Sequence, residues 1–308
     1  MKGGNGDVFR FAHEAMGTCF ELLIAGKGET YSRQVSAAVF AEIDRLERLF
    51  SRFDPSSEVS QINRLKPGES LRIGLEAFEC LETSARIKTQ TQGAFDINYK
   101  ALLKRKKGAP AGSGKMKRNM VKWVELSKTG GGYSVRARTG KVGEKRMPLD
   151  LDLGGIGKGY ALDKILDILE DWSVKDALIH SGTSTALAMG SPPSHKTEKR
   201  GWPVGIASGW ECRKAPRKFY LRNRAVSGSG TEIKGRHIFD PRTGRPTAGH
   251  LAAWASHSSA AVADALSTAF MVMDTAEVEA YCKLHPDVWA LVVTDTHNCE
   301  LFNRRVIT

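Results

Sequence analysis

A glycine-rich segment in the middle of the chain constrains the fold more than any other part of the sequence. Four glycines stand within six positions, from Gly154 to Gly159, and they join a strand-like run, Met147 to Leu153, to a helix-like run, Leu162 to Leu169. Glycine lets a backbone come close to a ligand, and a helix that starts here presents free N–H groups and the positive end of its dipole. Lys158 adds a cation. The segment is therefore suited to a phosphate group.

Taken alone, this segment leaves two explanations open. Its glycines do not follow the G-x-G-x-x-G order of a dinucleotide-binding turn. A strand-to-helix turn without any ligand explains these residues equally well. Other parts of the sequence are needed to distinguish the two explanations.

The order of the predicted elements indicates an α+β fold. Apolar residues at helical spacing predict helices at about residues 35–50, 75–89, 261–272 and 276–284. Short apolar runs predict strands at 20–25, 133–135, 177–180, 186–189, 204–207, 219–221, 225–226 and 289–293. Closely spaced strands favour antiparallel pairing. With 308 residues, of which 41% are hydrophobic, the chain can bury a large core.

The chain has a net charge of +12, and its basic residues are clustered. Five lie between Lys100 and Lys107, others follow as far as Arg118, and a second group spans 213–224. No aromatic-interleaved motif of the kind found in many nucleic-acid-binding proteins accompanies them. We expect a solvated basic face that could assist an anionic ligand, and no nucleic-acid partner. The glycine-rich stretch 101–118 is expected to be a mobile excursion from the core.

Cysteine usage and the N-terminus indicate a compartment. Five cysteines without C-x-x-C spacing argue against a disulfide framework and against a zinc site. Residues 1–10 are expected to be flexible, and they lack the apolar run of a signal peptide. No segment is apolar enough to span a membrane. We therefore expect a cytoplasmic protein, although a periplasmic location would follow if a leader had been removed.

Five further motifs accompany the glycine segment in a fixed order. They are Met16-Gly17-Thr18, Phe53 to Asn63, Gly93 to Ile97, His237 to Pro246 and Ala263 to Ala269. In this order and at these separations the motifs resemble the ApbE family, the FAD:protein FMN transferases. The resemblance runs from about residue 16 to about residue 274. It implies one domain over residues 1–308, folded as a two-lobed α+β sandwich of antiparallel sheets and helices, with the flavin in the cleft between the lobes.

A magnesium site is implied by the last motif together with the glycine segment. Asp264 and Thr268 are four residues apart on a predicted helix, with Ser267 beside them, so their oxygens share one face. Oxygen ligands suit a hard cation such as Mg²⁺. From the residues alone, Asp264 as a helix N-cap is the simpler explanation. The resemblance instead implies that Asp264 and Thr268 bind Mg²⁺ together with the backbone carbonyl of Gly155, and that Ser267 contributes its own carbonyl.

The resemblance also implies a set of flavin-binding residues. They are Met16, Phe53, Ala94, Phe95, Asp96, Asp152, Lys158 and Ile238. The rings of Phe53 and Phe95 could flank an aromatic ring system, and the carboxylates of Asp96 and Asp152 could accept hydrogen bonds from it. Plain strand alternation would explain Phe95 and Ile97 without any ligand.

His237 is the residue to which the resemblance gives a part in catalysis, because a histidine here lies near the pyrophosphate in the family. Cleaving FAD at its pyrophosphate requires neutralisation of charge and an acceptor for a proton. His237 or a nearby carboxylate could accept that proton. A purely structural role beside the turn at Asp240-Pro241 is the alternative.

The function that the resemblance implies is Mg²⁺-dependent transfer of FMN from FAD to a Thr or Ser hydroxyl of an acceptor protein, with release of AMP. Two alternatives stay open. One is an FAD pyrophosphatase, in which water replaces the hydroxyl. The other is a flavin-binding protein that has kept the fold and lost the transfer. This second alternative rests on three departures from the family pattern, at Asn98-Tyr99-Lys100, Gly182-Thr183-Ser184 and Ser227 to Glu232.

Overall fold

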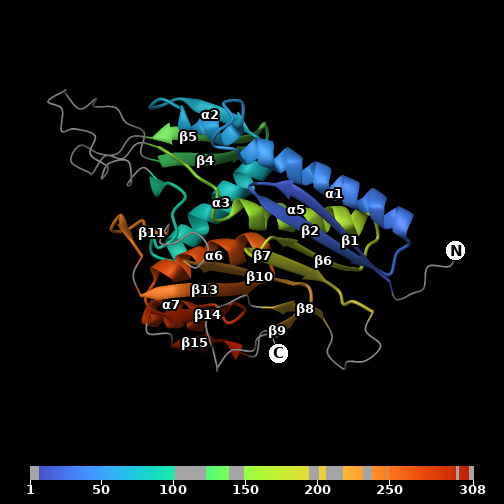
Figure 1. The fold of residues 1–308 in the computed structure, drawn as a ribbon. Helices are drawn as coiled ribbons and strands as arrows, with labels where there is room; N and C mark the ends of the chain where they lie inside the picture. Colours follow the sequence, from blue (N-terminus) through green and yellow to red (C-terminus); the bar gives the residue numbers. More distant parts are fainter. Residues whose placement is uncertain are drawn as a thin grey trace.

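An eight-stranded antiparallel sheet forms the centre of the protein (Figure 1). The computed structural model describes residues 7–100, 123–138, 149–193, 201–205, 218–231, 238–247, 249–295 and 298–304. The strands of the large sheet lie in the order β1-β2-β6-β7-β10-β13-β14-β15. Their bounds are Val8–Ala15, Thr18–Ala25, Asp176–Ser181, Thr185–Met189, Arg224–Gly230, His250–His257, Trp289–Thr294 and Cys299–Phe302.

Helices α1 (Glu29–Phe50), α5 (Gly157–Asp171) and α6 (Ala260–Val272) pack beside this sheet. On α1 the buried apolar residues recur at helical spacing, as expected for one face of an amphipathic helix: Val35, Val39, Ile43, Leu46 and Phe50. Helix α6 is different, because all of its residues except Thr268 and Val272 are buried. It contacts β10 and β13 on one side and α3 and α5 on others. Helix α6 is therefore the central element of the core.

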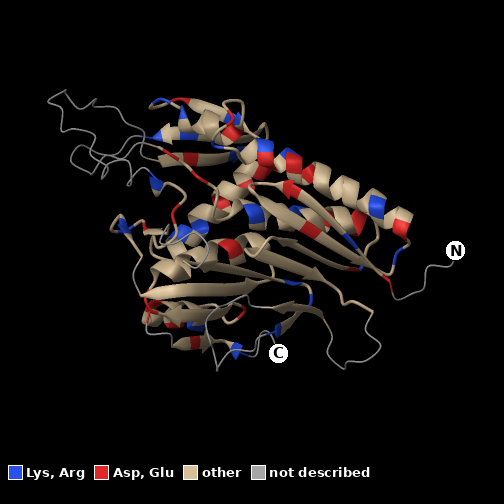
Figure 2. Cartoon of the chain, in the orientation of Figure 1, with Lys and Arg blue, Asp and Glu red and all other residues tan. Residues whose placement is uncertain are grey.

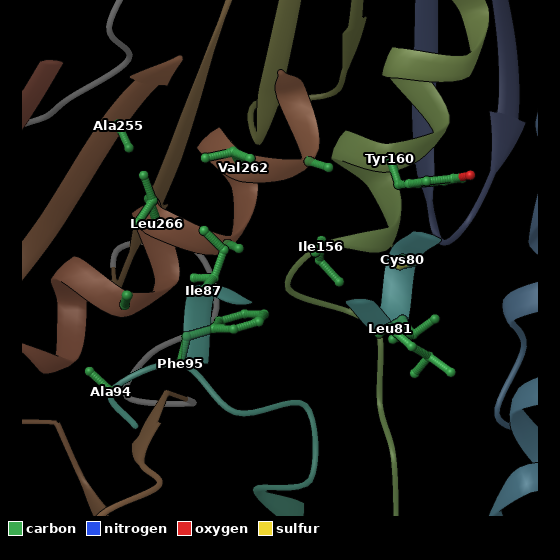
Figure 3. Packing of buried hydrophobic residues seen from close by; sticks show 14 of the residues in the cluster. Cys80, Leu81, Ile87, Ala94, Phe95, Ile156, Tyr160, Ala255, Val262 and Leu266 are labelled. Atoms are coloured by element: carbon green, nitrogen blue, oxygen red, sulfur yellow. The ribbon is translucent and has the colours of Figure 1, made fainter. Parts of the chain in front are cut away.

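A second, smaller sheet lies above α3 and α6 in Figure 1, and its strands follow the order β3-β5-β4. The elements of this layer are α2 (Glu58–Asn63), β3 (Ser70–Ile73), α3 (Leu75–Gln90), β4 (Trp123–Thr129) and β5 (Gly132–Arg138). Its apolar residues join those of α6 in one core cluster, in which Ile87, Phe95 and Leu266 lie close together (Figure 3).

Short strands cover further parts of the large sheet. Strands β8 (Trp202–Gly205) and β9 (Lys218–Leu221) pair with each other, and the ring of Phe219 lies 4.9 Å from that of Trp289. The remaining elements are β11 (Phe239–Asp240), β12 (Arg245–Pro246) and α7 (Thr275–Leu284). Charged side chains of both signs alternate along α1, whereas the visible part of β13 carries none (Figure 2).

The structure confirms the α+β class and the antiparallel arrangement, and it corrects three expectations. Strand β1 begins at Val8, inside the segment expected to be flexible. Residues 149–153 form no strand. Cys299 is disulfide-bonded, while Cys19, Cys80 and Cys282 are free. The excursion predicted at 101–118 and the residue His237 lie outside the described residues. No helix in the described ranges is long and apolar enough to cross a membrane.

Candidate functional site

Residues 149–153 lead into the glycine segment, and side chains rather than a strand partner hold them. Asn63 accepts a hydrogen bond from the Leu151 N–H at 2.7 Å and donates one to the Leu151 carbonyl at 3.0 Å. The Asn98 side chain accepts from the Asp150 N–H at 2.7 Å. The backbone groups here are therefore satisfied without a β-ladder. The apolar run predicts a strand, but these side chains take the place of the strand partner.

The glycine segment ends in α5, whose N-cap residue, Ile156, has no side-chain capping bond. Lys158 donates to the Gly154 carbonyl at 3.0 Å, and the Gly159 N–H donates to Oδ2 of Asp264 at 3.1 Å. A Cβ on Gly159 would stand 2.2 Å from the Ala260 carbonyl oxygen. Because only glycine allows this approach, the sequence Gly-Lys-Gly brings the start of α5 against α6.

Asp264 lies at the point where these two helices meet. The residue is only 2% exposed, and its Oδ2 lies 3.7 Å from the Lys158 ammonium. The N-cap of α6 is Ser259, whose hydroxyl accepts from the Val262 N–H. The explanation of Asp264 as an N-cap is therefore wrong: its side chain is a buried polar group within the helix, which needs hydrogen-bond partners.

Hydroxyl groups surround the Asp264 carboxylate. Ser227 donates to Oδ1 of Asp264 at 3.3 Å, and it also lies 2.9 Å from the Thr185 hydroxyl. The Ser229 hydroxyl lies 2.8 Å from that of Ser267 and 3.5 Å from that of Thr268.

The sequence analysis did not assign Thr185, Ser227 or Ser229 to the site. Alternation along β10 would have placed Ser227 and Ser229 on one face, but only the fold shows that this face meets α6. The backbone carbonyl of Ser184, one of the departures from the family pattern, accepts a hydrogen bond from the Gly228 N–H at 2.7 Å and lies 3.2 Å from the Ser227 hydroxyl. Any residue at this position would offer the same carbonyl.

Gly155 lies beside the same group of oxygens. A Cβ placed on it would be 3.3 Å from the Thr268 hydroxyl and 3.4 Å from the Phe95 ring. Phe95 is 3% exposed and packs in the core between α6 and the glycine segment (Figure 3). Residues 93–97 form turns rather than a strand, so strand alternation does not explain Phe95. Its ring is buried beside Gly155, and its part in flavin binding stays a prediction.

A second group of charges lies around Asp152. Arg52 contacts Oδ2 of Asp152 and Oδ1 of Asp150, both at 3.1 Å, and Lys100 also pairs with Asp152. Burial opposes the charge of Asp152, but hydrogen bonds from Lys100 and the Gly154 N–H, with the nearby Arg52, hold its pKa below the usual range. The carboxylate is therefore ionised, and Arg52, which the sequence analysis did not single out, fixes its position.

We expect Arg52→Met to lower the free energy of unfolding at pH 7 by about 2 kcal/mol, because it leaves two carboxylates poorly paired. The lowered pKa of Asp152 stabilises the fold above the unfolded value near pH 4, and this contribution disappears as the pH falls through the folded value. The penalty should therefore be smaller at a pH low enough to protonate the Asp152 carboxylate than at pH 7. Urea unfolding of the wild-type protein and of Arg52→Met at both pH values measures this penalty. An equal penalty at the two pH values would contradict the pairing of Arg52 with an ionised Asp152.

The structure places the other predicted flavin residues as follows. Met16 has a left-handed backbone (φ 51°) and donates its N–H to Glu47 at 2.7 Å. Phe53 is 85% exposed, with the Arg52 guanidinium 5.6 Å from its ring. Ala94 and Ile238 are buried. Both carboxylate oxygens of Asp96 are engaged, one by Lys88 at 2.7 Å and one by the Asn98 N–H.

A cavity of about 460 Å³ lies elsewhere, near the start of α7. It is lined by Arg242, Gly249, His250, Val272, Met273, Asp274, Thr275, Glu277, Thr294 and Asp295. None of the predicted flavin or metal residues is among them. The flavin cleft therefore stays a prediction.

Most of the chain is similar to one protein family. The model of the ApbE family matches residues 16–292. Relatives named FAD:protein FMN transferase include one from Chlamydia muridarum (26% identity, 79% of this chain and 78% of the relative). Another is from Buchnera aphidicola (24% identity, 75% and 71%).

Solved structures share the fold. The ApbE protein of Thermotoga maritima has 23% identity and a TM-score of 0.74, and the alignment covers 97% of this chain and 98% of that one. The apo form of the flavinyl transferase ApbE from Pseudomonas stutzeri has 22% identity and a TM-score of 0.77, over 98% and 96%. Because the family model spans most of the sequence, the chain belongs to the ApbE family.

Proposed function

We propose that this protein transfers FMN from FAD to a Thr or Ser hydroxyl of an acceptor protein and releases AMP. One observation carries the proposal: the buried Asp264 carboxylate lies where the glycine segment, the start of α5 and several hydroxyl groups meet. The activity in the names of the relatives agrees with such a site.

The oxygens around Asp264 fit Mg²⁺. Within the described ranges, no three His, Cys, Asp or Glu side chains are grouped closely enough to hold a metal ion between them. A cation here would therefore depend on one carboxylate with hydroxyl and carbonyl oxygens, which is an arrangement that Mg²⁺ accepts when substrate phosphates complete its shell. We assign Asp264, Thr268 and the carbonyls of Gly155 and Ser267 to this role. Bound there, Mg²⁺ would neutralise charge on the pyrophosphate.

The chain's own groups would bind and orient FAD. Lys158 is placed to bind a phosphate group, since its ammonium lies beside Asp264 at the start of α5. Phe53 is exposed and free to pack against a flavin ring. Since the ring of Phe95 is buried, we assign the contribution of residues 94–96 to their backbone and to the Asp96 carboxylate.

In the proposed transfer, the acceptor hydroxyl oxygen forms a bond to the phosphorus of the FMN half. The bridging P–O bond breaks, and AMP leaves with the electron pair. The hydroxyl proton passes to a base, for which we propose His237. This histidine directly precedes Ile238, the first described residue of its segment.

Incubation with FAD, Mg²⁺ and a candidate acceptor protein tests this function. We expect AMP and covalently bound flavin in equal amounts, measured by mass spectrometry of the nucleotides and of the intact acceptor, and neither product when EDTA is present. AMP with free FMN, and no labelled acceptor, would identify a pyrophosphatase instead. Flavin binding without AMP would identify a protein that has lost the transfer.

A further inference from the structure

Asp163 joins α5 to α6 by hydrogen bonds that are separate from the site itself. Its carboxylate accepts from the Ser259 hydroxyl at 2.6 Å, from the Ala260 N–H at 2.6 Å and from the Ala261 N–H at 3.0 Å. A carboxylate on one helix thus binds the free N–H groups at the start of another. Negative charge at a helix N-terminus is also favoured by the helix dipole.

This contact lies one turn of α5 beyond Gly159, the other point where the two helices touch. At Gly159 the backbones are so close that a Cβ would clash with Ala260, and the N–H binds Asp264. The two contacts are one turn apart on α5, and both meet Ala260 at the start of α6, so together they fix the distance and the angle between the helices. A single contact would allow α6 to pivot.

We propose that Asp163 is a positioning residue for the Mg²⁺ site, an inference that rests on the function proposed above. The presumed ligands come from two sides: Asp264, Ser267 and Thr268 from α6, and Gly155 from the loop before α5. Mg²⁺ requires nearly ideal octahedral geometry, so a small shift of α6 against α5 separates the ligands. Asp163 does not touch the ligands, but it sets the position of the helix that carries three of them.

Binding of Mn²⁺ alone, followed by electron paramagnetic resonance on the full chain, tests this role. We expect Asp163→Asn to weaken Mn²⁺ binding by about 10- to 100-fold, the usual effect of losing a residue that orients metal ligands. The matched control is Asp274→Ala. It removes the side chain that accepts from the Glu277 N–H at the start of α7. That helix carries none of the presumed ligands, so thermal stability should fall while Mn²⁺ affinity stays at the wild-type value.

Two further variants make the outcomes separable. Ser259→Ala removes only one of the three contacts, so it should weaken Mn²⁺ binding less than Asp163→Asn, and it replaces that variant if the latter does not fold. Wild-type affinity in both variants would overturn the positioning role while leaving the metal site intact. If Asp274→Ala weakened Mn²⁺ binding as much as Asp163→Asn does, the cause would be general destabilisation of the fold. That result would also overturn the positioning role of Asp163. Binding that does not change in Asp264→Asn would overturn the metal site, and this inference with it.

Discussion

Asp264→Asn should reduce metal-dependent cleavage of FAD by at least about a thousandfold, because a metal ion contributes several kcal/mol to phosphoryl transfer. The variant removes the one formal negative charge that we assign to the cation. Asparagine keeps the size of the side chain, and its oxygen can still accept from the Gly159 N–H, so the fold should survive. AMP release as a function of Mg²⁺ concentration gives the loss of rate.

The control for this prediction is Ser229→Ala. Ser229 contacts the hydroxyls of Ser267 and Thr268 but not the carboxylate. We expect this change to lower the rate much less than Asp264→Asn at saturating Mg²⁺. FAD cleavage at the wild-type rate in Asp264→Asn, with the same dependence on Mg²⁺, would show that the metal binds elsewhere.

The largest effect on stability is expected from Gly159→Ala. A Cβ here would stand 2.2 Å from the Ala260 carbonyl oxygen and 2.8 Å from the Asp264 Cβ, and the first of these is backbone, which cannot rotate away. Helices α5 and α6 would have to separate, at a cost of at least about 3 kcal/mol in the free energy of unfolding. Urea unfolding measures this difference.

Gly157→Ala is the matched control two residues earlier in the same helix. The nearest atoms to its new Cβ would be on Leu153 and Phe50, at 3.7 and 3.8 Å, which is ordinary contact. We expect a change within about 1 kcal/mol, since alanine also favours the helix. A similar loss of stability in both variants would mean that any side chain in this turn destabilises the protein. The close approach of α6 at Gly159 would then not be the cause of the loss.

The helices and strands were predictable where periodicity decides. The apolar spacing of α1 and the short runs that became β2, β6 and β14 predicted these elements close to their observed positions. The apolar run before Gly154 predicted a strand that does not form, because Asn63 and Asn98, which are distant in sequence, bind its backbone groups. Periodicity describes neighbours within one element and contains no information about such side chains.

The site was predictable only in part, for the same reason. Gly155, Asp264, Ser267 and Thr268 were assigned through the family pattern. The fold brings Gly155 beside the Thr268 hydroxyl and carries the other three on α6, and their role as metal ligands stays a prediction. The contacts from Ser227 and Asp163 join residues 37 and 96 or more positions apart. Neither residue type is unusual where it stands, so nothing local distinguishes it from an ordinary serine in a strand or aspartate in a helix.

The hydrogen bond from Gly159 to Asp264 spans 105 positions of the chain, and it has a consequence for folding. Closing a loop of this length costs conformational entropy before any contact within it can compensate. The two halves of the proposed metal site therefore come together only when α5 and α6 dock. An ion that requires both halves binds the native state and not the unfolded one, so it shifts the folding equilibrium by mass action. In a refolding experiment, recovery of metal binding would mark completion of the native structure rather than its beginning.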